Sequence, residues 1–207
     1  MEILCNTKDI IVAIKPAGIP SENNGKDNMI TRLSEYCETG EIYPVHRLDT
    51  VTSGVMVYAK TKKAAADITR EIKDGTFRKT YLAVVHGNVE PGKGMMEDLL
   101  FKDSRKNKSF VVKRERKGVK KAALTYEVLE QKNGLSLVKI QLLTGRTHQI
   151  RVQFSSRRHP VYGDGKYGAS DNIPFIALFS HSLTFKDPTS KKELTFTAPL
   201  PEWDFFR

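Results

Sequence analysis

The sequence of 207 residues has few of the features that mark secreted, metal-binding or membrane-spanning chains. Its two cysteines, Cys5 and Cys37, form neither a close pair nor a metal-ligand spacing. No apolar run approaches the length of a bilayer span, and residues 1–10 lack the layout of a signal peptide. These absences argue against a disulfide scaffold, a zinc site and a membrane protein, and they favour a cytoplasmic location.

Acidic residues are also in short supply. The chain has 24 Asp and Glu against 34 Lys and Arg, a formal net charge of +10. Hydrophobic residues make up 39% of the chain and charged residues 28%, so we expect a folded chain with a core. A positive surplus of this size favours a polyanionic partner, with nucleic acid ahead of an anionic membrane surface.

Most of the positive surplus falls within residues 102–121, which hold ten basic residues against two acidic ones. The apolar residues 110–112 interrupt this stretch and predict a short strand in a projecting basic hairpin. A solvated loop that is charged for solubility is the alternative, but a cluster of one sign is costly unless a polyanion relieves it. The candidate nucleic-acid contacts in this hairpin are Lys113, Arg114, Arg116 and Lys117.

Residues 45–54 gather a carboxylate, a guanidinium, an imidazole and three hydroxyls just before the apolar run 55–59. A charged loop beside a buried strand is a common construction of active sites, because the strand fixes the geometry that the loop exposes. We expect Leu48 and Val51 to face inward, so that Asp49 lies at the boundary between core and solvent. A solvated turn before a strand is the alternative interpretation.

Apolar runs, caps and turn signals predict an α+β fold with more strand than helix. Strands are expected at residues 10–14, 55–59, 80–85, 124–129 and 135–142, and near 176–179 and 194–196. Helices are expected at residues 29–36, at 62–73 after an N-cap at Thr61, and from His148 to about 156 after a cap at Thr147. Asn133-Gly134 predicts a hairpin turn. Because the sequence shows no internal repeat or linker, we expect one domain over residues 1–207.

Segments spread along the chain resemble, in the right order, the motifs of RluA-type RNA pseudouridine synthases. The segments that carry the resemblance are His46-Arg47-Leu48-Asp49 with Thr52-Ser53-Gly54, Lys79-Thr80-Tyr81-Leu82-Ala83, residues 144–151 with His159-Pro160, and Gly163-Asp164 with Tyr167-Gly168. Lys15-Pro16-Ala17-Gly18 and Ala198-Pro199-Leu200-Pro201 resemble the two ends of the family domain. The chain departs from the family at Ile14, where Asn is common, and at residues 178–180, where Leu-His-Ala is frequent.

The resemblance implies the pseudouridine synthase fold, a large mixed, mostly antiparallel sheet with flanking helices and a central RNA-binding cleft. It implies isomerisation of uridine to pseudouridine in structured ribosomal or transfer RNA, with no cofactor and no metal. By matching position, Asp49 is the catalytic aspartate, Tyr81 stacks on the target base, and Arg151 pairs with Asp49. Arg47 resembles the residue that enters the RNA when the uridine flips out. Further candidate RNA contacts in these motifs are His46, Arg146 and His148.

The chemistry of these side chains agrees with the implied roles. A uridine within an RNA helix must leave the stack, at a cost of a few kcal/mol, before an enzyme can reach it. An aromatic face such as Tyr81 returns roughly 1–3 kcal/mol by stacking. A bidentate guanidinium favours the ionised form of an enclosed carboxylate. The sequence leaves open whether Asp49 attacks carbon or stabilises a glycal-like intermediate.

Other interpretations stay open. Tyr81 can be a half-buried strand aromatic, and Arg151 a structural ion-pair partner. A noncatalytic RNA-binding or ribosome-assembly protein on the same fold is the alternative function, and a metal-dependent nuclease is a more distant one. Many relatives carry an S4-type RNA-binding domain before the catalytic one. Since the first family-like strand begins by Ile10, we expect no such domain, and we expect a monomer.

Overall fold

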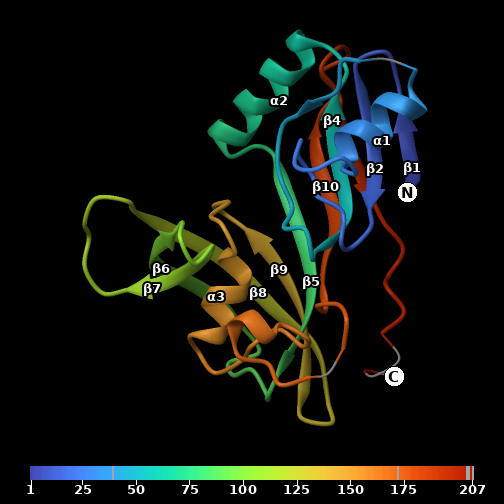
Figure 1. Ribbon diagram of the computed structural model, residues 1–207. Coiled ribbons are helices and arrows are strands. Elements are labelled where there is room, and N and C mark those ends of the chain that lie inside the picture. Colours follow the sequence, from blue (N-terminus) through green and yellow to red (C-terminus); the bar gives the residue numbers. More distant parts are fainter. Residues whose placement is uncertain (39, 172, 204–205, 207) are drawn as a thin grey trace. The chain divides into compact units, whose positions relative to one another are not determined.

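The computed structural model describes residues 1–38, 40–171, 173–203 and 206. The chain divides into two compact units, each of which is described by itself (Figure 1). The first unit comprises Met1–Lys79 and Phe179–Leu200, and the second comprises Thr80–Leu178 and Pro201–Arg207. The late strands of the chain thus return to the unit formed by the first residues. The expectation of one catalytic domain stays a prediction.

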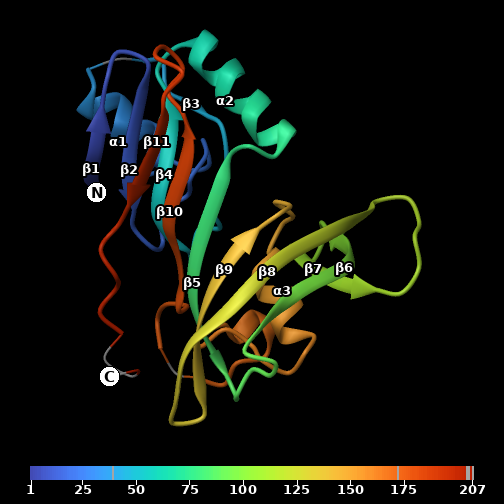
Figure 2. The same cartoon turned by 180° about the vertical axis from the view of Figure 1, so that it is seen from behind.

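The first unit contains a sheet with the strand order β1-β2-β4-β10, in which β11 also pairs with β10 and β3 with β4 (Figure 2). Its strands are β1 Glu2–Asn6, β2 Ile10–Lys15, β3 Tyr43–Pro44, β4 Ser53–Ala59, β10 Leu178–Lys186 and β11 Glu193–Thr197. β4 pairs antiparallel with β2 and parallel with β10. The apolar residues of β2 and β4 are almost all fully buried, so these strands form the core of the unit.

Two helices of the first unit form where the sequence predicts them. They are α1 Met29–Tyr36 and α2 Lys62–Asp74. The Thr61 side chain accepts a hydrogen bond from the amide of Ala64, which satisfies one free donor at the start of α2. α2 ends at Gly75, whose φ of 75° is the left-handed conformation that favours glycine. Both predicted helices are therefore confirmed.

The second unit contains the strand order β5-β9-β8-β6-β7, in which every neighbouring pair is antiparallel. Its strands are β5 Arg78–His86, β6 Lys93–Asp103, β7 Lys108–Val112, β8 Val119–Lys132 and β9 Leu135–Leu142. Asn133 and Gly134 join β8 to β9 with φ values of 55° and 73°, as a two-residue hairpin turn requires. The predicted basic hairpin is confirmed only in part: β7 pairs with β6, which was not predicted, and the loop of residues 113–118 leads to β8 on the other edge of β6. We keep the name basic hairpin for residues 102–121.

The predicted third helix is α3 Gln149–Ser155, but the predicted cap is wrong. His148 precedes the helix with a φ of 53° and no side chain caps it. Instead, Gln149 Oε1 accepts hydrogen bonds from the Thr144 hydroxyl (2.8 Å) and the Arg146 amide (3.0 Å). The Gln149 side chain thereby closes the loop before the helix, a task that the sequence pattern had assigned to Thr147.

The α+β prediction and the mixed, mostly antiparallel pairing are confirmed for the strands that the structure describes. The closing strand expected near residues 176–179 begins at Leu178 and continues to Lys186. A 3-10 turn, η1 Gly165–Tyr167, follows α3 in the second unit. No helix among the described residues is long and apolar enough to cross a membrane.

Candidate active site and basic hairpin

Asp49 lies in the loop between β3 and β4, which we call the aspartate loop (residues 45–52), and backbone contacts hold this loop. The amide of Thr52 donates to the carbonyl of Asp49 at 3.0 Å, which closes a turn. The buried Ser21 hydroxyl accepts from the Leu48 amide (3.2 Å) and donates to the Leu48 carbonyl (2.9 Å). Leu48 is buried as expected, but the prediction for Val51 is wrong because it is 39% exposed. Asp49 is half-buried, at the edge of the core.

Lys15, at the end of β2, is a buried cation that binds the aspartate loop. Its side chain is fully buried, and its Nζ donates to three backbone carbonyls, among them that of Thr50 at 3.1 Å. The amide of Gly18 donates to the same Thr50 carbonyl at 2.8 Å. Burial lowers the pKa of Lys15 to about 8, and the Asp49 carboxylate opposes this shift. The Lys-Pro motif therefore supplies both a hydrogen-bonded clamp and a positive charge near Asp49.

His46 fixes the start of the aspartate loop to β4. Its Nε2 accepts the amide of Val57 at 3.2 Å, and its Nδ1 is buried with no hydrogen-bond partner among the described residues. Burial, with a smaller effect of Lys79, holds the pKa of His46 well below its usual value. The ring is therefore neutral, with the proton on Nδ1. Arg47 is mostly exposed and forms a 3.2 Å ion pair with Glu22.

Gly54 fixes the end of the aspartate loop, where the chain enters β4. Its φ is 120°, and a Cβ there would lie 2.2 Å from the carbonyl oxygen of Ser180 on β10. Only glycine permits so close an approach of two strands. The Ser180 hydroxyl also donates to the carbonyl of Val55 at 3.0 Å. The loop that carries Asp49 is thus held at both ends and from Lys15.

In the second unit, Arg151 of α3 forms a bidentate ion pair with Asp164. Nε lies 2.6 Å from Oδ2 and Nη2 lies 2.8 Å from Oδ1, and the two side chains are 5% and 1% exposed. Two parallel hydrogen bonds fix the plane of the guanidinium. Gly163 has a φ of 81°, and a Cβ there would lie 2.1 Å from the carbonyl oxygen of Phe175. Asp164 had no predicted role, although the Gly-Asp pair was part of the third motif.

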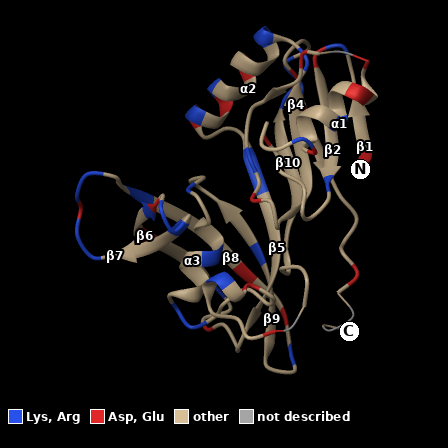
Figure 3. Cartoon of the chain, in the orientation of Figure 1, with Lys and Arg blue, Asp and Glu red and all other residues tan. Residues whose placement is uncertain are grey.

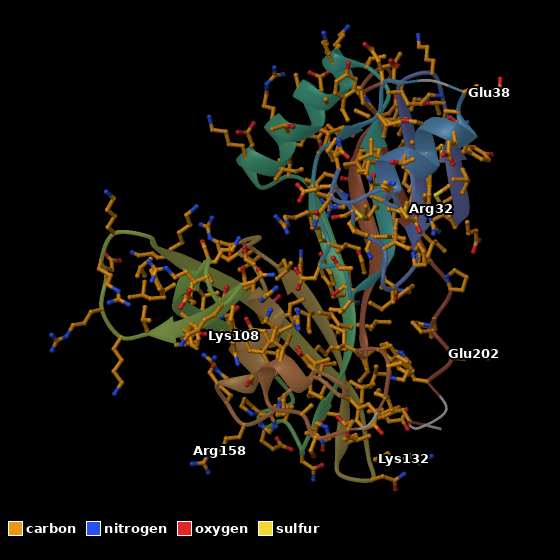
Figure 4. All side chains as sticks on the ribbon, in the orientation of Figure 1. Arg32, Glu38, Lys108, Lys132, Arg158 and Glu202 are labelled. Atoms are coloured by element: carbon orange, nitrogen blue, oxygen red, sulfur yellow. The ribbon has the colours of Figure 1, made fainter. Side chains whose placement is uncertain are left out.

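Tyr167 joins Arg151 to the basic hairpin. The Arg151 Cζ lies 5.1 Å and the Lys108 Nζ 4.9 Å from the centroid of its ring, distances at which cations are attracted to an aromatic face. The Tyr167 hydroxyl accepts the amide of Ser109 at 2.8 Å and lies 2.8 Å from Nδ1 of His148. Figure 4 labels Lys108, which begins β7. α3, η1 and β7 are therefore one connected cluster.

The remaining predicted site residues lie in the second unit. Arg146 donates from Nε to the carbonyl of Lys121 at 2.8 Å. Tyr81 lies in β5 opposite Ile140 of β9 and is 5% exposed. The stacking of Tyr81 on a base and the pairing of Arg151 with Asp49 stay predictions.

The basic hairpin carries its charge on exposed side chains. Lys113, Arg114, Arg116 and Lys117 are all exposed in the loop between β7 and β8, where Figure 3 shows a run of blue. The guanidinium of Arg116 lies 4.8 Å from the centroid of the Phe101 ring. The predicted strand at residues 110–112 is confirmed as part of β7. Contact of these residues with RNA stays a prediction.

Candidate metal ligands are not clustered in the part of the chain that the structure describes. There, no three or more His, Cys, Asp or Glu side chains are grouped so that they could hold a metal ion. Cys5 and Cys37 are free. The expectation that the chain needs neither metal nor cofactor stays a prediction.

Comparison with known proteins agrees with the motifs. A model of the RNA pseudouridylate synthase family matches residues 9–156. The chain is 33% identical over 214 residues to the uncharacterized RNA pseudouridine synthase YlyB of Bacillus subtilis, covering 98% of this chain and 70% of that protein. It is 33% identical over 222 residues to ribosomal large subunit pseudouridine synthase D of Neisseria meningitidis serogroup B, covering 97% of this chain and 58% of that protein.

Solved structures give the same result for the fold. Human RNA pseudouridylate synthase domain containing 1 superposes with a TM-score of 0.83 at 25% identity, covering 100% of this chain and 86% of that one. Human RNA pseudouridylate synthase domain containing 4 superposes with a TM-score of 0.80 at 25% identity, covering 99% and 90%. The predicted pseudouridine synthase fold is therefore confirmed, and its central RNA-binding cleft stays a prediction.

Proposed function

Since the chain belongs to the RNA pseudouridylate synthase family, we propose that it converts specific uridines of ribosomal or transfer RNA to pseudouridine by means of Asp49. Family membership makes the chain an RNA-modifying isomerase. The observation that most favours Asp49 is the way in which its loop is held. The carboxylate is half-buried on a loop that is fixed at both ends, and the buried Lys15 ammonium lies close to it. An enclosed carboxylate needs such a charge nearby to stay ionised.

The proposed reaction breaks the N1–C1′ bond, turns the uracil within the site and joins C5 to C1′. The hydrogen on C5 leaves as a proton and N1 takes up a proton, so the reaction is an isomerisation without oxidation or reduction. In this proposal Asp49 acts as nucleophile or electrostatic stabiliser at the sugar, and Tyr81 stacks on the flipped base. Arg151 pairs with the Asp49 carboxylate in this proposal, and Asp164 holds the guanidinium in its plane.

The RNA must open before this chemistry, and the exposed cations are suited to that step. We propose that Arg47 enters the RNA helix as the uridine leaves it, because its side chain is 57% exposed and its ion pair with Glu22 is at the surface. The basic hairpin supplies affinity for the phosphate backbone. The neutral His46 has both ring nitrogens turned inward, so we assign it to holding the loop as well as to lining the RNA.

Tritium release from RNA labelled at uridine C5 tests the proposal. Release reports formation of the C5–C1′ bond, which neither cleavage nor binding produces. Asp49→Asn should lower the rate roughly 10³-fold or more, as expected when a group that acts on transition-state charge is lost. The variant should still bind RNA. Asp74→Asn, the same change at an exposed carboxylate of the first unit, is the control and should retain full activity.

Two outcomes would count against the proposal. Wild-type protein that binds ribosomal and transfer RNA but releases no tritium from either would favour the noncatalytic alternative. Asp49→Asn protein that keeps wild-type rates would remove Asp49 from the chemistry.

A further inference from the structure

A recess of about 150 Å³ lies in the second unit where β6 ends and where β7 and β8 begin. Strands β6, β7 and β8 form one side, and the loop that precedes α3 forms the other. Three cations line it, Lys102, Lys120 and Arg146, together with Ser109, Gly145 and Thr147. Arg146 was predicted as an individual RNA contact, and Lys102 and Lys120 belong to the basic segment 102–121 that was predicted as a whole to favour RNA.

The strand register places the two lysines on one face of the sheet. Lys120 on β8 lies opposite Leu100 on β6, and Lys102 follows two residues along β6. Residues two apart on a strand share a face, so the two lysines are diagonal neighbours, with Cα atoms roughly 7–8 Å apart. Leu100 between them is 4% exposed and forms an apolar floor. The two ammonium groups therefore rise from the same small area.

The nearby acidic residues do not neutralise these cations. Oδ1 of Asp103 accepts the amides of Arg105 and Lys106 in the turn after β6, at 2.9 and 3.1 Å. Glu115 lies 3.7 Å from the ammonium of Lys121 instead. Among the described residues, neither Lys102 nor Lys120 has an ion-pair partner. Uncompensated like charges that line one recess favour an anion from outside the chain.

The recess is also held in shape and offers donors without charge. The Ser109 hydroxyl donates to the carbonyl of Thr147 at 2.7 Å, which joins its two sides. Arg146 is held by its own bond to the carbonyl of Lys121. Within the described ranges, the amides of Gly145 and Thr147 donate to no acceptor. Free backbone N–H groups beside cations are typical of sites that bind phosphate oxygens.

We propose that this recess seats one phosphodiester group of the bound RNA, held by Lys102, Lys120 and Arg146. The inference rests on the proposed function, which makes RNA the ligand. It divides the basic hairpin into two parts. The recess binds a phosphate at a defined position, whereas the exposed residues 113–117, in the loop between β7 and β8, act through a general positive field.

Salt dependence of RNA binding tests the proposal. Lys102→Gln and Lys120→Gln should each weaken binding roughly fivefold near 0.1 M salt and lower the slope of log K against log salt by about 0.7–0.9. Because both lysines hold the same phosphate, the double variant should lose less than the product of the single effects. Lys132→Gln, an equal change in charge at the exposed end of β8 (Figure 4), is the control and should have little effect.

Phosphate ethylation interference gives the sharper result. A transcript that wild-type protein retains on a filter is ethylated, and the positions that block retention are mapped. The Lys102→Gln, Lys120→Gln double variant should lose interference at one phosphate and keep the rest. Lys132→Gln, outside the basic hairpin, should leave the pattern unchanged. The proposal would be overturned if the double variant kept the wild-type interference pattern and its loss of affinity equalled the product of the two single losses. The lysines would then contribute only to the general positive charge of the hairpin.

The experiment separates this proposal from the proposed function. Filter retention and ethylation need binding only, so an absence of tritium release would not affect their outcome. In the activity assay, the recess variants should raise KM more than they lower kcat, because the recess lies outside the residues assigned to the chemistry. A fall in kcat with an unchanged KM would contradict a role in seating RNA.

Discussion

Lys15 in the first unit and Arg151 in the second are both buried cations, but the chain compensates their charges differently. Lys15 donates to three backbone carbonyls and has Asp49 as a nearby charge. Arg151 has a dedicated carboxylate, Asp164, in a bidentate pair. Burial lowers the pKa of Lys15 to about 8, so the charged form of Lys15 is held at a cost.

The difference indicates two ways to position a functional group. Carbonyl acceptors tie a lysine to the backbone of a loop, so Lys15 can order the aspartate loop while its charge remains available to Asp49. A carboxylate partner fixes the plane of a guanidinium and places a negative charge beside it. We therefore expect Arg151 to depend on Asp164 more strongly than the aspartate loop depends on Lys15.

The largest expected effect is that of Asp164→Asn. Removing one partner of a buried ion pair leaves the other charge poorly compensated and costs roughly 3–5 kcal/mol. Chemical denaturation should show this loss in the free energy of unfolding, and tritium release should fall because the guanidinium is no longer held in its plane.

A double variant separates stability from activity at this pair. Arg151→Met with Asp164→Leu replaces the buried ions by apolar side chains, which is often neutral for stability. It should unfold close to the wild-type free energy yet remain inactive. If it were active, Arg151 would be a structural ion-pair partner, the interpretation that the sequence left open.

Lys15→Met should have a smaller effect. Three carbonyls lose a donor, which lowers the free energy of unfolding by roughly 1–3 kcal/mol. Part of that loss is offset because the variant no longer buries a charge. Activity should fall roughly tenfold, because Asp49 loses a nearby positive charge worth about 1 kcal/mol or more. Lys60→Met, in the same unit, removes hydrogen bonds to Asn6 and Thr7 that are exposed. An equal loss in both variants would show that burial of Lys15 has no special role.

Sequence patterns predicted the elements of the fold better than the contacts of the site. Local signals sufficed for α2, where Thr61 and Gly75 mark its ends, and for the turn at Asn133-Gly134. β6 escaped prediction because its buried residues, such as Met96 and Leu100, are separated by charged ones and lie four apart, a spacing typical of a helix.

The site shows the same division. The motifs identified Asp49, Arg151 and Arg146, because residue type and order are visible in a sequence. The groups that hold them were not visible: the Ser21 hydroxyl at Leu48 and the Asp164 carboxylate at Arg151 depend on the tertiary fold. Lys15 was noted only as part of a motif that resembles one end of the family domain, since lysine is seldom fully buried and nothing local marks an exception.

The smallest expected effect is a pH dependence that isolates Lys15. Its pKa is about 8 in the folded chain and 10.5 is its ordinary value, so between these values the unfolded chain binds more protons. The free energy of unfolding therefore rises with pH in this window, and the penalty for the buried charge is fully present below pH 8. Burial lowers the pKa of Lys79 to about 8 as well, so wild-type protein alone cannot assign the slope.

A comparison of the wild-type protein with Lys15→Met assigns the part of this pH dependence that Lys15 causes. Between pH 8 and pH 10, the free energy of unfolding measured in urea should rise by on the order of 1 kcal/mol more for the wild-type protein than for the variant. The variant keeps only the contribution of Lys79. This range stays below the pH at which Tyr58, whose pKa burial raises, would reverse the trend. Parallel changes in the two proteins would mean that Lys15 keeps its ordinary pKa. Burial would then impose no effective desolvation on the Lys15 ammonium. The two buried cations, Lys15 and Arg151, would differ only in the geometry of their hydrogen bonds.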